Sequence, residues 1–129
     1  MAATPSGAGY WLMAADGRAR WAFNTSTGTE QPDTNEGRTY LADTPPGRWR
    51  IYRQVDGVRV SNLGRLIRPK YFHTDGIALH GYSYVPPVPA SHGCVRVTLA
   101  AIDFIWAEDL APIGAEVWVY GTTPPVPAR

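Results

Sequence analysis

Proline and glycine interrupt this chain so often that they disfavour a bundle of helices. Its 129 residues include 12 prolines and 13 glycines, and both residue types destabilise the interior of a helix. Apolar residues make up 44% of the chain, which is enough to build a buried core. No apolar run approaches the roughly 20 residues that cross a bilayer. We therefore expect one domain built from many short strands.

Two pairs of segments predict β-hairpins. The segments YWLMA and RWAFNTST flank the turn ADGR and predict a first hairpin. The segments GRWRIYRQV and VRVSN flank Asp56 and Gly57 and predict a second, because an Asp-Gly pair adopts the positive φ of a tight turn at low cost. GIALHGY and AEVWVYG are expected to be further short strands. The sequence thus predicts a mainly β fold, a sandwich or a partial barrel.

Only one segment, LAAIDFIWAEDL at 99–110, predicts a helix. Its apolar residues recur near helical spacing, and Thr98 is placed to cap its N-terminus. Pro112 and Gly114 are expected to end it. Aromatic side chains bury large areas, so we expect the tryptophans of the strands and the helix mainly in the core: Trp11, Trp21, Trp49, Trp106 and Trp118.

The charge and the chain ends narrow the possible classes of protein. The net charge is +1, with 12 basic and 11 acidic residues spread along the chain, whereas nucleic-acid binding normally needs a clustered basic face. We expect no nucleic-acid partner. Residues 1–8 and 122–129 are expected to be tails or linkers around a domain at 9–121. The start MAATPSGAG lacks the basic and apolar regions of a signal peptide. The chain is therefore either cytosolic or a domain whose export signal has been trimmed.

The stretch ALHGYSYVPPVPASHGCVRV, residues 78–97, contains the only cysteine and two of the three histidines. A thiol near its reference pKa of about 8.5 is mostly protonated at neutral pH and needs a base beside it. His92 lies two residues before Cys94, and a strand, a loop and a return could bring His80 against it. Gly93 leaves room for a substrate, and the N–H groups of Gly93 and Cys94 could face an oxyanion.

Simpler interpretations of these residues stay open. A free cysteine is most often a small buried apolar residue, although His, Gly and Arg are poor neighbours for an inert thiol. A zinc site could use His73, His80, His92 and Cys94, but the paired spacing of structural zinc ligands is missing, so we expect no metal. We expect Ser91 to hydrogen-bond locally, and His73 to be solvated or to lie behind the site.

The stretch LHGYSYVPPVPASHGCVRV resembles the active-site signature of the L,D-transpeptidase catalytic domain family, also called YkuD-like. That signature is a His-Gly or His-Ser strand end, a variable loop, and Ser/Thr-His-Gly-Cys followed by an apolar residue and Arg or Asn. NTSTGTEQPDT, DTPPGRWRI and RLIRPKYFHTDGIALHG resemble other family segments in the same order. The resemblance covers about residues 9–121. It implies a β-sandwich-like fold with one helix after the cysteine.

The resemblance also implies a bacterial cell-wall enzyme that needs no cofactor. Members form a cysteine acyl-enzyme on the third residue of a peptidoglycan stem and release D-alanine. An amine of a neighbouring stem, or of an anchored protein, then takes the acyl group. Such enzymes act in the periplasm or the extracellular cell wall, and β-lactams of the carbapenem class inhibit them covalently.

Site roles follow from the same resemblance. Cys94 would be the nucleophile, His80 the general base, and the carbonyl of Gly81 would orient the imidazole. His92 and Gly93 would shape the pocket. The expected substrate-binding residues are Arg96, Ser91, Tyr71 and Tyr82. Two alternatives remain: an L,D-carboxypeptidase that uses water as acceptor, and a non-catalytic cell-wall or zinc-binding module on the same fold.

Overall fold

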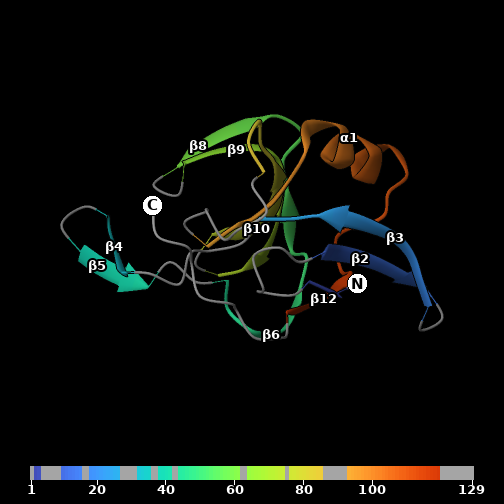
Figure 1. Cartoon of the computed structure of the whole chain (residues 1–129), viewed down its shortest axis with the longest axis horizontal. Helices are drawn as coiled ribbons and strands as arrows, with labels where there is room; N and C mark the ends of the chain where they lie inside the picture. The colour runs from blue at the N-terminus through green and yellow to red at the C-terminus, as the bar shows by residue number, and fades with distance from the viewer. Residues whose placement is uncertain are drawn as a thin grey trace.

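A computed structural model shows a strand-dominated fold with one helix (Figure 1). The structure describes residues 2–3, 10–15, 18–26, 32–35, 38–41, 44–61, 64–74, 76–85 and 93–119. The predicted tail at 122–129 lies outside these residues. No described helix is long and apolar enough to cross a membrane. The prediction of a mainly β fold is confirmed.

The first sheet has five strands in the order β3-β2-β1-β12-β6. The first predicted hairpin is confirmed, because β2 and β3 pair antiparallel, and the predicted C-terminal strand is β12. Unexpectedly, a pair of residues from the predicted N-terminal tail forms β1, which pairs with both β2 and β12. The strand bounds are β1 Ala2–Ala3, β2 Tyr10–Ala15, β3 Arg18–Asn24, β6 Gly47–Arg50 and β12 Glu116–Val119.

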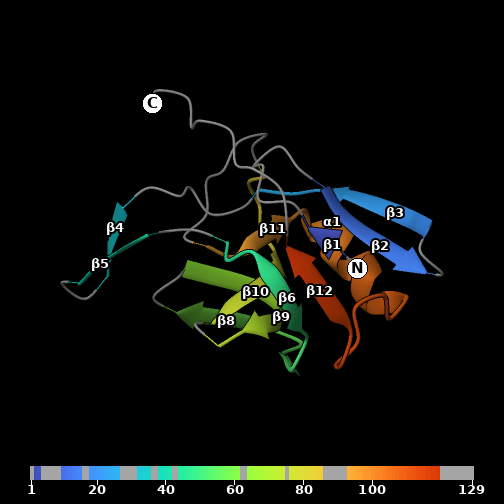
Figure 2. The same ribbon diagram turned by 90° about the horizontal axis from the view of Figure 1, so that it is seen from below.

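The second sheet carries the residues of the predicted site. Its strands run in the order β11-β10-β9-β7, and β8 also pairs with β9. Only the β10–β11 pair is parallel within this sheet. The bounds are β7 Arg53–Gln54, β8 Val58–Ser61, β9 Gly64–His73, β10 Ile77–Gly81 and β11 Val95–Val97. A separate ribbon of β4 (Pro32–Asn35) and β5 (Arg38–Leu41) lies to one side in both ribbon views (Figures 1 and 2).

The second predicted hairpin is wrong. β6 pairs with β12 in the first sheet, whereas β7 and β8 both pair with β9 in the second. The turn between them is held by β9 itself: the N–H of Arg68 donates to the carbonyl of Gly57 at 2.7 Å, and the N–H of Val55 donates to the carbonyl of Pro69 at 3.1 Å. β7 and β8 therefore form their strand hydrogen bonds with β9 and not with each other.

The predicted helix exists as α1, Leu99–Ala107, and begins where expected. Thr98 is its N-cap, and its hydroxyl accepts the N–H of Ala101 at 3.1 Å. This bond satisfies one of the backbone donors that a helix start leaves unpaired.

The helix ends earlier than predicted, well before Pro112. Asp109 adopts a left-handed φ of 51°. Its N–H donates to the carbonyl of Trp106 at 3.2 Å, and the N–H of Leu110 donates to that of Ile105 at 3.0 Å. These two bonds make a Schellman motif, which closes the helix without needing a proline.

The main core lies between the two sheets and is closed by α1. Both sheets and the helix contribute side chains that are almost fully buried: Ile51, Phe72, Ile77, Leu79, Val95, Val97, Ile102, Ile105, Ala111, Val117 and Val119. This arrangement confirms the sandwich. Trp49 and Trp106 are only partly buried against this core, and Trp21 and Trp118 are 41% and 42% exposed. The prediction of tryptophans mainly in the core is therefore wrong for Trp21 and Trp118. On β12 the smaller Val117 and Val119 take the inward positions, so Trp118 faces outward.

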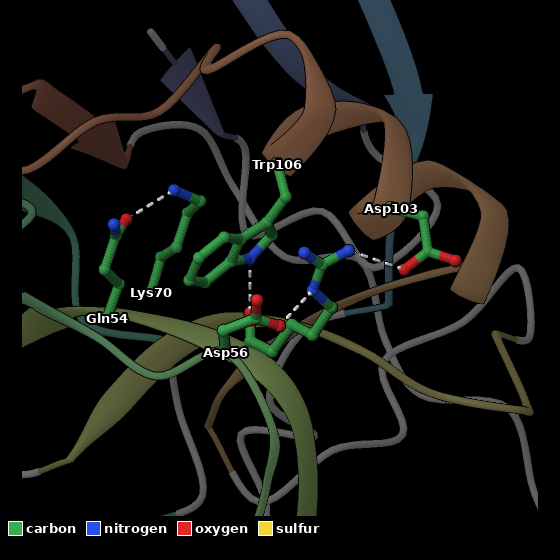
Figure 3. A network of polar contacts seen from close by, with 6 residues as sticks. Gln54, Asp56, Lys70, Asp103 and Trp106 are labelled. Atoms are coloured by element: carbon green, nitrogen blue, oxygen red, sulfur yellow. Dashed lines mark hydrogen bonds and ion pairs between the residues drawn. The ribbon is translucent and has the colours of Figure 1, made fainter.

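A buried lysine joins β9 to the end of α1 (Figure 3). Lys70 is 1% exposed, and its Nζ donates to Gln54 Oε1 at 2.7 Å and to the carbonyl of Ala111 at 2.9 Å. The same Nζ lies 4.4 Å from the ring centroid of Trp106, whose Nε1 donates to the carbonyl of Arg68. Burial lowers the pKa of Lys70. This network fixes the helix against the second sheet.

Candidate active site

The parallel pairing of β10 and β11 determines which side chains share a face. Leu79 pairs with Val95, and His80 pairs with Arg96. Side chains alternate along a strand, and Leu79 and Val95 point into the main core. His80 and Arg96 therefore occupy the opposite face of the sheet. Cys94, two residues before Arg96, lies on this face as well.

Cys94 sits in a second, smaller apolar cluster on that face. The thiol residue is 2% exposed and packs with Leu66, Tyr71 and Ala78. Its Sγ lies 3.7 Å from the carbonyl oxygen of Gly76, to which the thiol donates. Burial raises the pKa of Cys94 to about 11, opposed by a backbone hydrogen bond from Ala78 and by the charge of Arg96. The free thiol is therefore protonated at neutral pH.

His80 is buried at the end of β10, and its ring is oriented by the next residue. Nδ1 lies 2.8 Å from the carbonyl oxygen of Gly81. A carbonyl only accepts, so Nδ1 carries the proton and Nε2 keeps a lone pair. Burial lowers the pKa of His80 to about 4, with a smaller contribution in the same direction from Arg96 and an opposing one from the Gly81 carbonyl. The imidazole is thus neutral at neutral pH and able to accept a proton.

Arg96 places a positive charge that acts on both His80 and Cys94. Its guanidinium carbon lies 4.2 Å from the ring centroid of Tyr82, and that ring meets the His80 ring edge-on at 6.0 Å. Its Nε is buried and has no hydrogen-bond partner among the described residues. The backbone of Arg96 exchanges two hydrogen bonds with Ser26, at 2.9 and 3.1 Å. Arg96 is therefore fixed at its backbone and stacked at its side chain.

Gly93, directly before the cysteine, has a φ of 128°, a value that L side chains rarely adopt. Its carbonyl oxygen accepts the Thr44 hydroxyl at 2.7 Å, and Thr44 is fully buried. Thr44 is not among the residues that the sequence predicts for the site. Its only local signal is its place in DTPPGRWRI, because Gly93, whose carbonyl it contacts, lies 49 residues away in the sequence.

Several residues predicted for the site lie near one another in the structure. Cys94, His80 and Arg96 share a face, and Tyr71 packs in the Cys94 cluster. The Tyr82 ring contacts both the His80 ring and the Arg96 guanidinium. The roles predicted for them stay predictions. Ser91 and His92 lie outside the described residues.

His73, the last residue of β9, packs its ring against Trp49 of the first sheet. Its ring is half-buried and meets Trp49 edge-on, with ring centroids 4.6 Å apart. Its carbonyl oxygen accepts the hydroxyl of Tyr52. Within the described part of the chain, no three His, Cys, Asp or Glu residues lie close enough together to hold a metal ion.

Comparisons with known proteins agree with the family resemblance of the sequence and with the observed fold. Residues 4–119 match the family described as the L,D-transpeptidase catalytic domain. No curated protein sequence matches the chain significantly.

Several solved structures have a similar fold. An L,D-transpeptidase from Xylanimonas cellulosilytica is 40% identical, with a TM-score of 0.83, and the match covers 92% of this chain and 59% of that one. L,D-transpeptidase 3 from Mycobacterium tuberculosis, with a faropenem-derived adduct, is 15% identical with a TM-score of 0.67, covering 93% and 59%. An L,D-transpeptidase in complex with imipenem is 15% identical with a TM-score of 0.69, covering 92% and 57%. The last two likenesses concern the fold alone. The chain thus spans less than two thirds of the length of each.

Proposed function

Because this chain belongs to the L,D-transpeptidase catalytic domain family, we propose that it transfers peptidoglycan stem peptides through an acyl-enzyme on Cys94. The observation that carries the proposal is that a base and a thiol share one face of the second sheet. His80, with Nδ1 on the Gly81 carbonyl, presents a lone pair at Nε2, and Cys94 lies on the same face of the next strand. Nucleophile, base and orienting group are the three parts that activate a cysteine.

The resting state of this pair is neutral. The raised pKa of Cys94 and the lowered pKa of His80 disfavour a thiolate–imidazolium pair in the free protein. The proton therefore moves as substrate is attacked. His80 Nε2 takes the Sγ proton while the Sγ–carbon bond forms, and the carbonyl electrons move onto oxygen. Arg96, which stacks on Tyr82, favours the thiolate that develops at this point.

The oxyanion then collapses and the peptide bond to D-alanine breaks. D-Alanine leaves with the proton held by His80, and a thioester remains on Cys94. An amine of a neighbouring stem or an anchored cell-wall protein attacks this thioester, loses a proton to His80, and releases the thiol. No cofactor enters this sequence. Such substrates lie outside the cytoplasm, so the proposed location is the periplasm or the extracellular cell wall.

The proposal is tested by mass spectrometry of the intact chain after incubation with imipenem. Opening of the β-lactam by Cys94 should add the whole mass of imipenem, since no group leaves when the ring opens. Cys94→Ala should take up none, and His80→Ala should acylate far more slowly. An adduct that persists in C94A, or a wild-type chain that forms none, would contradict the nucleophile assignment.

The acceptor is tested separately with a tetrapeptide stem. A cross-linked dimer is the product expected of transfer, and free tripeptide alone would indicate the carboxypeptidase. Cys94 is 2% exposed among apolar side chains. Such a lining limits the access of water and favours transfer.

A further inference from the structure

Thr44 holds the peptide group from which the nucleophile's own N–H projects. We propose that Thr44 is a positioning residue for acyl transfer: its hydroxyl fixes the Gly93 carbonyl and thereby aims the N–H of Cys94 at the oxyanion. The inference rests on the proposed function and assigns a role to a residue outside the cysteine–histidine pair. It starts from one hydrogen bond, Thr44 Oγ1 to the carbonyl oxygen of Gly93, at 2.7 Å.

The direction of the Cys94 N–H follows from the geometry of the peptide group. The carbonyl of Gly93 and the N–H of Cys94 belong to the same peptide, which is planar and trans. In a trans peptide these two bonds point in opposite directions. A hydroxyl that fixes the carbonyl on one side therefore fixes the direction of the N–H on the other. Rotation of this peptide would break the Thr44 bond.

Burial makes this bond an effective constraint. Thr44 is 0% exposed and Gly93 is buried, so water does not compete for the carbonyl. Gly93 has no side chain to restrict the rotation of this peptide, so the Thr44 bond supplies the constraint. A donor at the carbonyl also polarises the amide and strengthens its N–H as a donor. Thr44 thus affects both the direction and the strength of the group.

This role matters only when an oxyanion forms. Acyl transfer places negative charge on the carbonyl oxygen, and outright loss of one oxyanion donor costs about 10²–10³ in kcat. Alkylation of a thiol by iodoacetamide forms the sulfur–carbon bond as iodide leaves, and no oxyanion develops. A comparison of the two reactions at Cys94 therefore separates a positioning role from a general effect on the fold.

The test compares Thr44→Val, which removes the hydroxyl, with Thr44→Ser, which keeps it. With imipenem as the acylating probe, Thr44→Val should lower the second-order rate constant of acylation roughly 10- to 100-fold, because the donor is misplaced rather than lost. Its alkylation by iodoacetamide should stay within about twofold of wild type, as expected where no oxyanion forms. Thr44→Ser should restore acylation. Should the valine variant not fold, Thr44→Ala takes its place.

Thr98→Val is the matched control, since it removes a threonine hydroxyl that caps α1 rather than one that contacts Gly93. It should acylate like wild type. The inference is overturned if Thr44→Val acylates at the wild-type rate, or if its alkylation falls as far as its acylation. A wild-type chain that takes up no imipenem at Cys94 would instead overturn the proposed function, and this inference with it.

Discussion

At the scale of single residues, burial decides the protonation of Cys94 and His80, the proposed nucleophile and base. Cys94 and His80 are each 2% exposed, and burial moves their pKa values apart, to about 11 and about 4. Arg96 favours the thiolate and disfavours the imidazolium, so it helps Cys94 to lose its proton but opposes the uptake of that proton by His80. Between these two pKa values the thiol and the imidazole are both neutral, and the imidazole can act as a base.

The pH dependence of Cys94 alkylation reports this state. Since the thiolate is the nucleophile, the rate with iodoacetamide should rise about tenfold per pH unit from neutral pH towards the pKa of about 11. N-Acetylcysteine, the control, should level off above its ordinary pKa. Arg96→Gln removes a charge that favours the thiolate and should slow alkylation at every pH below the midpoint. A plateau already reached at neutral pH would show that a thiolate–imidazolium pair exists at rest.

At the scale of elements, the packing of α1 on β10 explains why a glycine follows His80. A Cβ added at Gly81 would lie 2.5 Å from Cγ2 of Ile102 and 3.4 Å from Cδ2 of Leu99. Ile102 is fully buried in the main core and cannot swing into solvent. The strand end that orients His80 is thus pressed directly against the helix.

Gly81→Ala should therefore destabilise the fold. We expect the free energy of unfolding in urea to fall by about 1–3 kcal/mol, the usual cost of an overpacked core. Gly57→Ala is the matched control, because its Cβ would meet no atom within 4 Å. If both alanine variants unfold at the same urea concentration, the contact between β10 and α1 does not constrain this position.

The elements that the sequence predicts correctly are those with local signals. Thr98 caps its own helix, and the first hairpin joins neighbouring segments, so each can be recognised within a few residues. β9 was not recognised as a strand, because Pro69 and the buried Lys70 break an apolar pattern and its partners β7 and β8 lie elsewhere in the chain. The candidate site shows the same difference. The motif predicts roles for Cys94 and His80 from the sequence, whereas the bond from Thr44 exists only in the folded chain.

At the scale of the whole molecule, two contacts connect the first half of the chain to the segment around Cys94. Ser26, just after β3, exchanges backbone hydrogen bonds with Arg96, and Thr44, just before β6, donates to Gly93. Their partners, Arg96 and Gly93, both lie within three residues of Cys94 in the sequence. Cys94 is thus positioned by segments next to β3 and β6, the two edge strands of the first sheet.

The rate at which Lys70 is chemically labelled measures how often the native fold opens around it. It is the only lysine of the chain and is 1% exposed, so an amine-acetylating reagent should modify it at least roughly 100-fold more slowly in the native chain than in urea. Mass spectrometry of peptides gives this rate, and Lys70→Arg serves as the unlabelled control. Rapid native labelling would show that the loop around Ala111 opens independently of global unfolding.

The burial of Lys70 has a further consequence for the acyl transfer to amines that we propose. A lysine on the surface would compete with the amine of the proposed acceptor, and each acyl-enzyme could then attach its stem peptide to a neighbouring copy. This chain has no other lysine, and its basic surface is made of arginines, whose guanidinium groups stay protonated and are poor nucleophiles. Under the proposed function, a thioester on Cys94 would therefore meet no exposed lysine of its own chain, and an external acceptor would take the acyl group.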